Sequence, residues 1–398
     1  MSGFELFVDE VNGRLHAAIV KKTGLYDLYT DPLNRVAAWG AIHCGRITKI
    51  DKKLDAAIVD LGNGQSGILP AKHVHLPGGD ASESRSGIAD LVKNGQMLMV
   101  QVKAEAKRTS EHEHQKLPRL TTQIYVMGHH LVYCPHANPV TMSRNIERKD
   151  VLGMTAKLKA PGGWILKHHA GEEDLDVLKA EAAKLLAEWQ VLLGVKSESG
   201  NSPATLKGGP NALYRALYDY GSNSFDHIHI GNKKLFSMMT EWCAKYSPPL
   251  ATSKRLRLFK PEKPQQRLFD IHDIFGALEE LEETRVDLPC GGSLLFDATH
   301  ALVVVDVNQG SATDPIIANN EAAAETARQI RLRNLSGAIL VDFISLPERT
   351  TRARLSDLVD DLINSDYSGA QAHGFTRLGI MEITRKRRTG WYSEKLKS

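Results

Sequence analysis

The chain has 398 residues, of which 42% are hydrophobic and 24% are charged, and its formal net charge at pH 7 is +3. This length allows about two to four domains, and the hydrophobic content excludes a wholly disordered chain. No apolar run approaches the roughly 20 residues that span a bilayer, and the start lacks a signal-peptide pattern, so we expect a cytoplasmic protein with no membrane partner.

The four cysteines, Cys44, Cys134, Cys243 and Cys290, lie far apart in the sequence. This spacing excludes a disulfide scaffold and a CxxC zinc knuckle. We therefore expect reduced thiols, and we interpret Cys243 and Cys290 as small buried hydrophobic residues.

The first third of the chain predicts β-structure. Residues 4–8 and 14–20 alternate in polarity around the turn Val11-Asn12-Gly13, which indicates a hairpin. Between residues 37 and 122 five more short strands follow, with no helical pattern longer than a turn or two. Five strands in under about 100 residues are typical of a small closed barrel of the OB type. The predicted barrel strands cover residues 42–50, 56–61, 66–70, 97–105 and 120–125.

The middle of the chain predicts alternating helices and strands. Apolar residues recur at steps of four and three from Leu178 to Leu192, which indicates an amphipathic helix over residues 175–195 that ends at Gly194. A Pro- and Lys-rich stretch at residues 260–266 then indicates a boundary. Between them we expect helices at residues 212–218 and 233–246 and a strand at residues 225–230.

The last third predicts a further sheet with two helices. We expect Asn319 or Asn320 to cap the first helix and Ser336-Gly337 to stop it. The predicted strands cover residues 293–297, 302–307, 338–344 and 378–384, and the predicted helices cover residues 321–335 and 355–363.

Two aspartates occupy matching positions in this region. Asp306 ends the apolar run 302–305, and Asp342 ends the apolar run 338–341. A charged side chain at the end of a buried strand is costly unless it is paired or binds a metal. If the strands are neighbours, the two carboxylates supply oxygen ligands for Mg²⁺, with Mn²⁺ as the alternative ion. Asn308, two residues further on, faces the same side of the strand and can orient a carboxylate or a phosphate.

The alternative is that each aspartate caps the helix that follows its strand. A single aspartate would favour capping. Two aspartates in matched contexts leave the metal-binding and the capping interpretations about equally supported, and both stay open.

Five basic residues are candidate contacts to a phosphate backbone. Arg331 and Arg333 lie on the helix between the two aspartates, and Arg385 follows the last strand. Lys49 and Lys116 belong to the predicted barrel. Arginine forks and lysine charges both bind phosphate. The alternative is that these side chains belong to a solvated helix face, a solvated tail and an ordinary charged barrel surface.

Histidines occur in pairs, among them His129-His130, His168-His169 and His227-Ile228-His229. The last pair shares one strand face and would suit a metal if a third ligand were near. No third ligand follows at a suitable spacing, so we interpret the histidines as surface or half-buried residues.

Seven segments, in this order and spacing, resemble the ribonuclease E/G family of endoribonucleases. The match between Asp306 and Ile344 is the most specific part. The segments are GRIT at residues 45–48, LDAAIVD at 54–60, GILP at 67–70, GGS at 291–293, VDVN at 305–308, ARQIRLRNLSG at 327–337 and VDFI at 341–344.

The resemblance implies an α+β multidomain fold. An RNase H-like domain would be split between residues 1–36 and 205–278, and an OB-fold barrel at residues 37–125 and a 5′-sensor-like domain at residues 126–204 would be inserted into it. A DNase I-like α/β catalytic domain would follow at residues 279–398. In the family, two strand-end aspartates bind catalytic Mg²⁺ and an asparagine supports one of them. The resemblance carries these roles over to Asp306, Asp342 and Asn308.

The chain also departs from the family pattern. It ends at Lys395-Leu396-Lys397-Ser398 without the CPxC zinc link that joins two subunits, so we expect no zinc and no zinc-linked dimer, which leaves a monomer or another oligomer. Residues 165–171 lack the Arg-Thr pair of the family's 5′-end sensor, and its second arginine falls near Gly369.

The predicted barrel departs from the family as well. The positions of the family's two stacking aromatics fall at Ile58 and Ile68, whereas its RNA-contacting lysine is retained at Lys116. The loop after Asn308, residues 309–320, is shorter than usual.

Together these observations predict a Mg²⁺-dependent endoribonuclease that cleaves single-stranded RNA to 5′-phosphate and 3′-hydroxyl products, with ribosomal RNA precursors or messenger RNA as substrates. A non-catalytic RNA-binding or ribosome-associated protein is the second hypothesis, and a DNase or phosphodiesterase using the same acids is the third. The retained Asp306, Asn308 and Asp342 favour catalysis, because a pure binding protein needs no pair of strand-end acids.

Overall fold

The computed structural model describes residues 3–75, 87–106, 116–136, 141–142, 158, 161–198, 200, 202–263, 265–299 and 301–393. The chain end considered above for a zinc link lies outside these residues. The chain divides into two compact units, one made of Met1–Asn34, Ser224–Met239 and Thr252–Ser398 and the other of Arg35–Asn223 and Thr240–Ala251. No helix in the described part is both long and apolar enough to cross a membrane.

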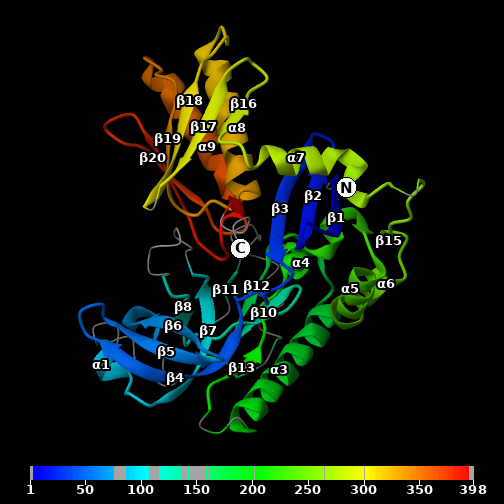
Figure 1. The fold of residues 1–398 in the computed structure, drawn as a ribbon, viewed down its shortest axis with the longest axis vertical. Coiled ribbons are helices and arrows are strands. Elements are labelled where there is room, and N and C mark those ends of the chain that lie inside the picture. The colour runs from blue at the N-terminus through cyan, green and yellow to red at the C-terminus, as the bar shows by residue number, and fades with distance from the viewer. Residues whose placement is uncertain are drawn as a thin grey trace. The chain divides into compact units, whose positions relative to one another are not determined.

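A five-stranded sheet in the first unit joins segments that lie far apart in the sequence (Figure 1). Its order is β15-β14-β1-β2-β3, in which β1 pairs in parallel with β14 and antiparallel with β2. The predicted hairpin is confirmed, and its turn places Asn12 at φ 50° and Gly13 at φ 72°, the left-handed region that these two residue types tolerate best. The strands are β1 (Phe4–Val11), β2 (Arg14–Lys21), β3 (Gly24–Pro32), β14 (Phe225–Ile230) and β15 (Leu256–Leu258).

The second unit contains the expected five-stranded barrel. Strand β4 pairs antiparallel with both β5 and β7, and β8 joins β6 in parallel and β7 antiparallel, so the sheet closes on itself. Val59, Leu69, Val100 and Leu120 fill its interior. The strands are β4 (Ile42–Asp51), β5 (Ala56–Gly62), β6 (Gln65–Pro70), β7 (Met97–Ala104) and β8 (Arg119–Thr121), with β13 (Ala204–Lys207) added beside β4.

A small sheet and one long helix form another core in this unit. Leu178, Leu185 and Trp189 of helix α3 (Leu175–Glu198) pack with Tyr133 and Trp164 of the sheet. The helix continues through Gly194, so the predicted end there is wrong. A glycine inside a helix lowers the stability of the helix by only about 1 kcal/mol relative to alanine, which is too little to end a helix that is held by this packing. The strands are β9 (Val126–Met127), β10 (Leu131–Cys134), β11 (Thr141–Met142) and β12 (Gly163–Leu166), in the order β11-β12-β10-β9.

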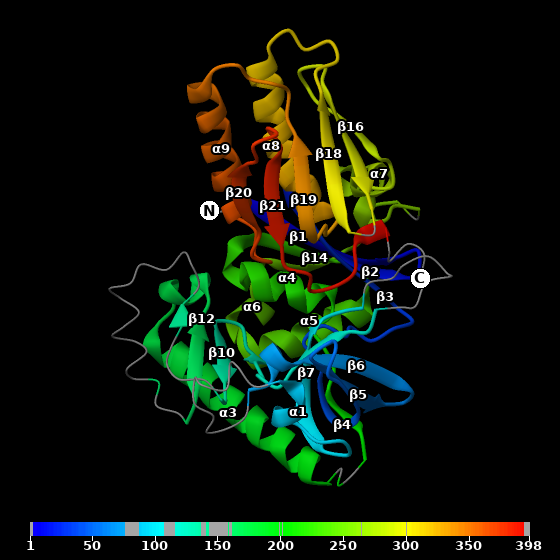
Figure 2. The same cartoon turned by 90° about the vertical axis from the view of Figure 1, so that its left-hand side faces the viewer.

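The last third of the chain forms a six-stranded sheet in the order β16-β17-β18-β19-β21-β20. Helices α8 (Pro315–Leu332) and α9 (Arg349–Asn364) run along one face of it (Figure 2). Alternate strand residues, such as Val305 and Val341, point into the core on that side. The strands are β16 (Arg285–Asp287), β17 (Ser293–Ala298), β18 (Leu302–Asn308), β19 (Gly337–Asp342), β20 (Gln371–Phe375) and β21 (Met381–Arg385).

Helix α8 begins six residues before its predicted start. Its N-cap is Asp314, whose carboxylate accepts a hydrogen bond from the Ile316 amide at 2.7 Å, and Pro315 occupies the first turn. Asn319, expected as a cap, is instead fully buried. Its amide side chain accepts from the Ile344 amide at 3.0 Å and donates to the Ile344 carbonyl at 2.8 Å.

The remaining helices are short or follow the predictions closely. Asn211 caps α4 by accepting a hydrogen bond from the Tyr214 amide at 3.0 Å. The helices are α1 (Ile88–Leu91), α4 (Ala212–Tyr220), α5 (Lys233–Tyr246), α6 (Pro248–Ala251) and α7 (Ile274–Glu280).

Candidate functional site

The two predicted aspartates lie side by side in the six-stranded sheet. Strands β18 and β19 are parallel neighbours, and Asp306 and Asp342 are direct partners in their register. Neighbouring strands are about 4.8 Å apart, so the two side chains leave one face from adjacent positions. Asn308 donates a hydrogen bond from Nδ2 to Asp306 Oδ2 at 2.9 Å.

The aspartates occupy the face of the sheet that α8 and α9 leave open. Val305 and Val307 point into the core, whereas Asp306 is half-buried and Asp342 and Asn308 are exposed. The expectation that both strand-end acids are buried is therefore wrong, because they point to the sheet face that the helices leave open, which they share with the half-buried Val304 and Leu340. Solvent access suits a site that must admit a phosphodiester.

Neither aspartate caps a helix. Asp314 caps α8, and Glu348 stands at the N-cap of α9. The capping alternative is thereby excluded for Asp306 and Asp342. Among the described residues, neither carboxylate forms an ion pair with a basic side chain.

This donor set fits a hard divalent cation. Two adjacent carboxylates supply part of an oxygen shell that water and a phosphate oxygen would complete, which is how Mg²⁺ is usually bound. The hydrogen bond from Asn308 orients Asp306 in the way that neighbouring groups orient metal ligands.

A cross-strand row on the barrel forms the second candidate surface. The pairing register places Lys49 opposite Ile58, Ile58 opposite Ile68, and Ile68 opposite Arg119, across four strands. The two isoleucines are half-buried, and the basic residues at both ends are exposed. Lys116, also exposed, precedes the strand that carries Arg119. We call Lys49, Ile58, Ile68 and Arg119 the barrel row.

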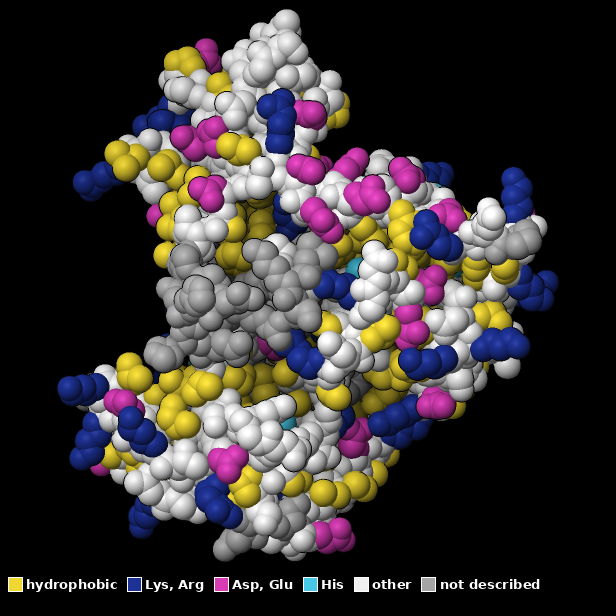
Figure 3. Space-filling model, viewed as in Figure 1, with side chains coloured by type: hydrophobic (Ala, Val, Ile, Leu, Met, Phe, Trp, Pro, Cys, Tyr) yellow, Lys and Arg dark blue, Asp and Glu magenta, His cyan; other side chains and the backbone are white. Residues whose placement is uncertain are grey.

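The barrel carries positive charge around this row. Figure 3 shows Lys and Arg side chains around the margin of the region that holds β4–β6, with hydrophobic side chains and a few acidic ones between them. On the same barrel, burial together with Lys103, Arg119 and Lys72 lowers the pKa of His73 from 6.5 to about 4. A field of this sign attracts a polyanion.

The three candidate arginines are not available to RNA. Arg331, Arg333 and Arg385 are 7%, 8% and 6% exposed, so neither the phosphate-binding nor the solvated interpretation fits them. Arg331 lies 4.4 Å from the centre of the Tyr26 ring, and Arg333 donates to Gln329 Oε1 at 2.6 Å. We therefore remove all three from the candidate RNA contacts.

A cluster of buried histidines is the feature that sequence reasoning missed. His129, His130 and His169 are 2%, 4% and 8% exposed, and one ring nitrogen of each lies within 4.8 Å of those of the other two. The predicted surface or half-buried position is wrong for these three residues. The signal was the two His-His pairs, but periodicity does not show that the two segments meet.

The environment keeps two of these rings uncharged. Burial, reinforced by His130, His169 and Lys167, lowers the pKa of His129 well below 6.5. Burial, followed by Lys167, lowers the pKa of His169 to about 2. At neutral pH each of these two rings is therefore a neutral imidazole, with one N–H group and one nitrogen that carries a lone pair.

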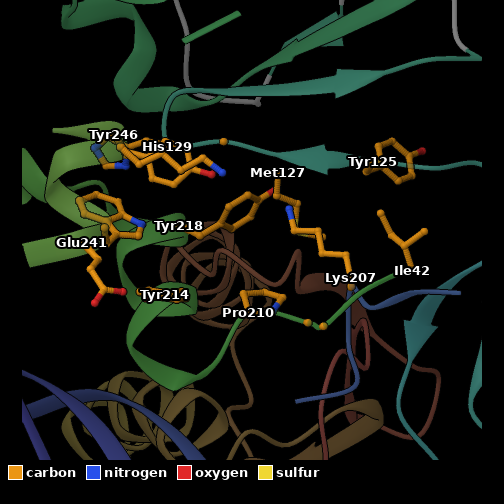
Figure 4. Close-up of a pocket in the computed structure, with 16 residues that line it drawn as sticks. Ile42, Tyr125, Met127, His129, Lys207, Pro210, Tyr214, Tyr218, Glu241 and Tyr246 are labelled. Carbon is orange, nitrogen blue, oxygen red and sulfur yellow. The ribbon is translucent and has the colours of Figure 1, made fainter. Parts of the chain in front are cut away.

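His129 also lines a pocket of about 350 Å³ in the second unit (Figure 4). Aromatic side chains form much of its wall, including Tyr125, Tyr214, Tyr218, Trp242 and Tyr246. Lys207 and Lys245 reach it as well, and both pair with Glu188.

Comparison with known proteins agrees with these features. The Ribonuclease E/G family matches residues 126–388. Ribonuclease G of Salmonella typhimurium (strain SL1344) is 30% identical over 404 residues, which cover 96% of this chain and 80% of that protein. The chain belongs to the ribonuclease E/G family. Ribonuclease E of Escherichia coli (strain K12) is 31% identical over 391 residues, which cover 94% of this chain and 36% of that longer protein.

Membership of the ribonuclease E/G family confirms the predicted resemblance over nearly the whole chain. The family match includes both aspartates, Asn308 and the histidine cluster. It begins at Val126, so the barrel row falls outside it, although the alignments to the two relatives extend over most of the chain.

Proposed function

We propose that this member of the ribonuclease E/G family is an endoribonuclease that cleaves single-stranded RNA with Asp306 and Asp342 as its metal-binding acids. The observation that carries the proposal is the register pairing of these two residues on an open sheet face. The family supports an RNA substrate over DNA, whereas the oxygen donors and the basic barrel suit the phosphodiester backbone of either nucleic acid.

In this proposal each residue has a defined part. Asp306 and Asp342 hold Mg²⁺, or Mn²⁺ in its place, and Asn308 fixes the orientation of Asp306 through its hydrogen bond. The bound ion would polarise the phosphodiester and lower the pKa of an attacking water. Cleavage would leave a 5′-phosphate and a 3′-hydroxyl.

The finer assignments belong to the same proposal. We propose an RNase H-like domain from residues 1–36 and 205–278, the barrel at 37–125, a sensor-like domain at 126–204 and a DNase I-like domain at 279–398. The parallel pairing of β1 with β14 and of β14 with β15 supports the first of these. Cytoplasmic processing of ribosomal RNA precursors or messenger RNA would suit such an enzyme.

The test compares cleavage of one labelled single-stranded RNA by the wild type, Asp306→Asn and Asp342→Asn in saturating Mg²⁺. We expect each variant to lose at least about 100-fold in rate, because a lost ligand charge costs several kcal/mol of transition-state stabilisation. Asp297→Asn is the matched control, since Asp297 is an exposed acid on β17 of the same sheet and pairs with Val304 rather than with either aspartate.

Near-normal cleavage by either aspartate variant would refute the proposed site. No cleavage by the wild type, with RNA binding intact, would favour the non-catalytic alternative. Equal cleavage of the matching DNA would favour the general phosphodiesterase.

A further inference from the structure

The histidine cluster has an arrangement that ordinary hydrogen bonding does not explain. His129 and His130 stand between β9 and β10, and His169 lies in the 3-10 turn after β12. All three are more than nine-tenths buried. Within the described residues, Nδ1 of His129 and Nδ1 of His169 are buried without any hydrogen-bond partner. Buried polar atoms are normally paired, so two such atoms in one cluster need an explanation.

The other nitrogen of each ring is already held in place. His129 Nε2 lies 3.1 Å from Ser222 Oγ and accepts a hydrogen bond from the Ser222 amide at 3.3 Å, and His169 Nε2 donates to the His129 carbonyl at 2.8 Å. Metal binding through Nδ1 of His129 therefore requires the tautomer that carries its proton on Nε2, directed to Ser222 Oγ. His130 Nδ1 lies 2.8 Å from Glu181 Oε2. His129 and His169 thus have one ring nitrogen held in place and the other without a partner. Metal-binding histidines show this pattern, because they direct their second nitrogen to a carboxylate, a carbonyl or a hydroxyl.

Glu181 shows how firmly His130 is fixed. The buried carboxylate accepts from the His130 and Leu131 amides at 2.9 and 3.1 Å, in addition to its contact with the ring. A Cβ on Gly128 would come within 2.2 Å of this carboxylate, so the glycine makes room for it. The remaining nitrogen of His130, Nε2, lies 3.3 Å from Glu173 Oε1.

We propose that His129, His130 and His169 bind one divalent transition-metal ion, with Zn²⁺ as the best match, and that Glu173 supplies the fourth ligand. The atoms assigned to the ion are Nδ1 of His129 and Nδ1 of His169, which have no partner, and Nε2 of His130, which lies 3.3 Å from Glu173 Oε1. Three imidazoles favour Zn²⁺ and its neighbours in the first transition row, whereas Mg²⁺ and Ca²⁺ prefer oxygen.

The ring positions allow closure on an ion. Zn–N bonds of about 2.0–2.1 Å place tetrahedral ligand atoms about 3.4 Å apart. One ring nitrogen of each histidine already lies within 4.8 Å of those of the other two, so closure of the rings on an ion needs inward movements of about 1 Å. His129 also lines the pocket (Figure 4), which provides an entry path for the ion. A bound ion would link the β9–β10 connection to the turn after β12.

This site is separate from the one that the proposed function uses. Its ligands lie in the second unit, whereas Asp306 and Asp342 lie in the first. The expectation of no zinc was based on the missing cysteines, and the histidine pairs were set aside because no third ligand follows at a suitable spacing in the sequence.

The test uses the full chain without a polyhistidine tag, stripped of metal with a chelator and titrated with Zn²⁺ and then Co²⁺. We expect one equivalent of Zn²⁺ to bind saturably, a rise in Tm with Zn²⁺, and intense visible bands from tetrahedral Co²⁺. The Asp306→Asn/Asp342→Asn double variant should bind the same equivalent. A wild-type protein that shows no saturable Zn²⁺ binding would overturn the proposal, whatever the variants do.

Variants then assign the ligands. His129→Gln and His169→Gln should abolish the Co²⁺ bands and the Zn²⁺-dependent rise in Tm, and Glu173→Gln should weaken binding and shift the bands. His168→Gln is the matched control, because His168 adjoins the cluster in sequence but is only half-buried and outside it. Full binding by His169→Gln, or loss of binding in His168→Gln, would contradict the assignment. If a histidine variant does not fold, the wild-type titration and Glu173→Gln still decide the outcome.

Discussion

Arg385 is an internal cation of the six-stranded sheet. Its Nε donates to Asp366 Oδ1 at 3.0 Å, and its Nη1 donates to the Leu335 carbonyl at 3.0 Å. The side chains of Arg385 and Asp366 are 5% and 4% exposed. Removing one partner of such a buried pair leaves an uncompensated charge, whereas the pair itself adds little net stability.

We therefore predict that Arg385→Ala lowers the free energy of unfolding by about 3–5 kcal/mol, as measured by urea denaturation. Lys386→Ala, at the exposed neighbouring position, should change it by less than about 0.5 kcal/mol. The folded fraction of Arg385→Ala should bind RNA as the wild type does. Normal stability with reduced RNA affinity would instead make Arg385 a contact residue.

The residue-level predictions succeeded where a local pattern determines the geometry. Two apolar runs with a helix between them indicate parallel neighbouring strands, and this is how Asp306 and Asp342 come to be paired. The pattern could not show that Arg331, Arg333 and Arg385 turn inward, because their partners lie on other elements. For the same reason it could not bring His169 beside His129 and His130.

At the scale of elements, helix α3 contains a glycine that does not end the helix, because the packing of its apolar side chains holds the helix in place. Gly194 lies in the helix, is exposed, and has no atom within 4 Å of where a Cβ would stand. We predict that Gly194→Ala raises the free energy of unfolding by about 0.5–1 kcal/mol, since alanine loses less backbone entropy in a helix.

Gly67→Ala is the opposing control for that measurement. A Cβ on Gly67 would come 2.6 Å from Leu120 Cδ1 inside the barrel. Overpacking of this kind costs about 1–3 kcal/mol, so urea unfolding should show the two alanine variants moving in opposite directions. A destabilised Gly194→Ala would mean that α3 ends earlier than the structure shows.

Element boundaries were predicted least well where competing signals stand close together. Asp314-Pro315 is a good helix start, yet Asn319 and Asn320 offered a second one nearer the apolar repeat.

The strands β3, β16 and β20 were not predicted at all. Each lies at the end of its sheet, and β16 has only three residues, so little apolar pattern marks it.

The composition of the barrel row predicts that RNA is held more by basic side chains on its phosphates than by aromatic rings stacked on its bases. Ile58 and Ile68 pair directly, but neither offers a ring to a base. An aromatic contact is worth about 1–3 kcal/mol per base, so Ile58→Phe should tighten binding of unpaired RNA by about fivefold or more. Ile58→Leu should leave the affinity unchanged, and an unchanged affinity in both variants would remove the row from the RNA path.

Salt dependence tests the same surface independently. Lys116→Ala should weaken binding about equally for all sequences and reduce the slope of log K against log salt by about 0.7, the value for one lost phosphate contact on a single strand. Lys179→Ala, an exposed lysine of α3, is the control. A flat salt response in the wild type would argue that the barrel binds a protein instead.

At the scale of the whole molecule, we predict that cleavage does not depend on the phosphate at the RNA 5′ end. Lys167, in the stretch that lacks the sensor pair, donates to the Gly128 carbonyl at 2.8 Å and the Tyr218 carbonyl at 3.1 Å. Its ammonium also lies 3.2 Å from the centre of the Tyr218 ring. The group is directed inward and is only 7% exposed.

Rates on 5′-monophosphate and 5′-hydroxyl forms of one oligonucleotide should agree within about threefold, a difference of less than 1 kcal/mol. Asp306→Asn provides the uncleaved baseline. A strong preference for the monophosphate would show that another basic group in this region binds it.

The pairing of β1 with β14 also affects how the chain is made. Strands β1–β3 leave the ribosome first, but the partner of β1 follows roughly 200 residues later, which is about 10–40 s at ordinary rates of synthesis. During that interval β1 is an open edge that can pair with the wrong strand or with another nascent chain. Slowing translation between the two segments should therefore lower the soluble yield, whereas slowing it after Ile230, when β14 is complete, should not.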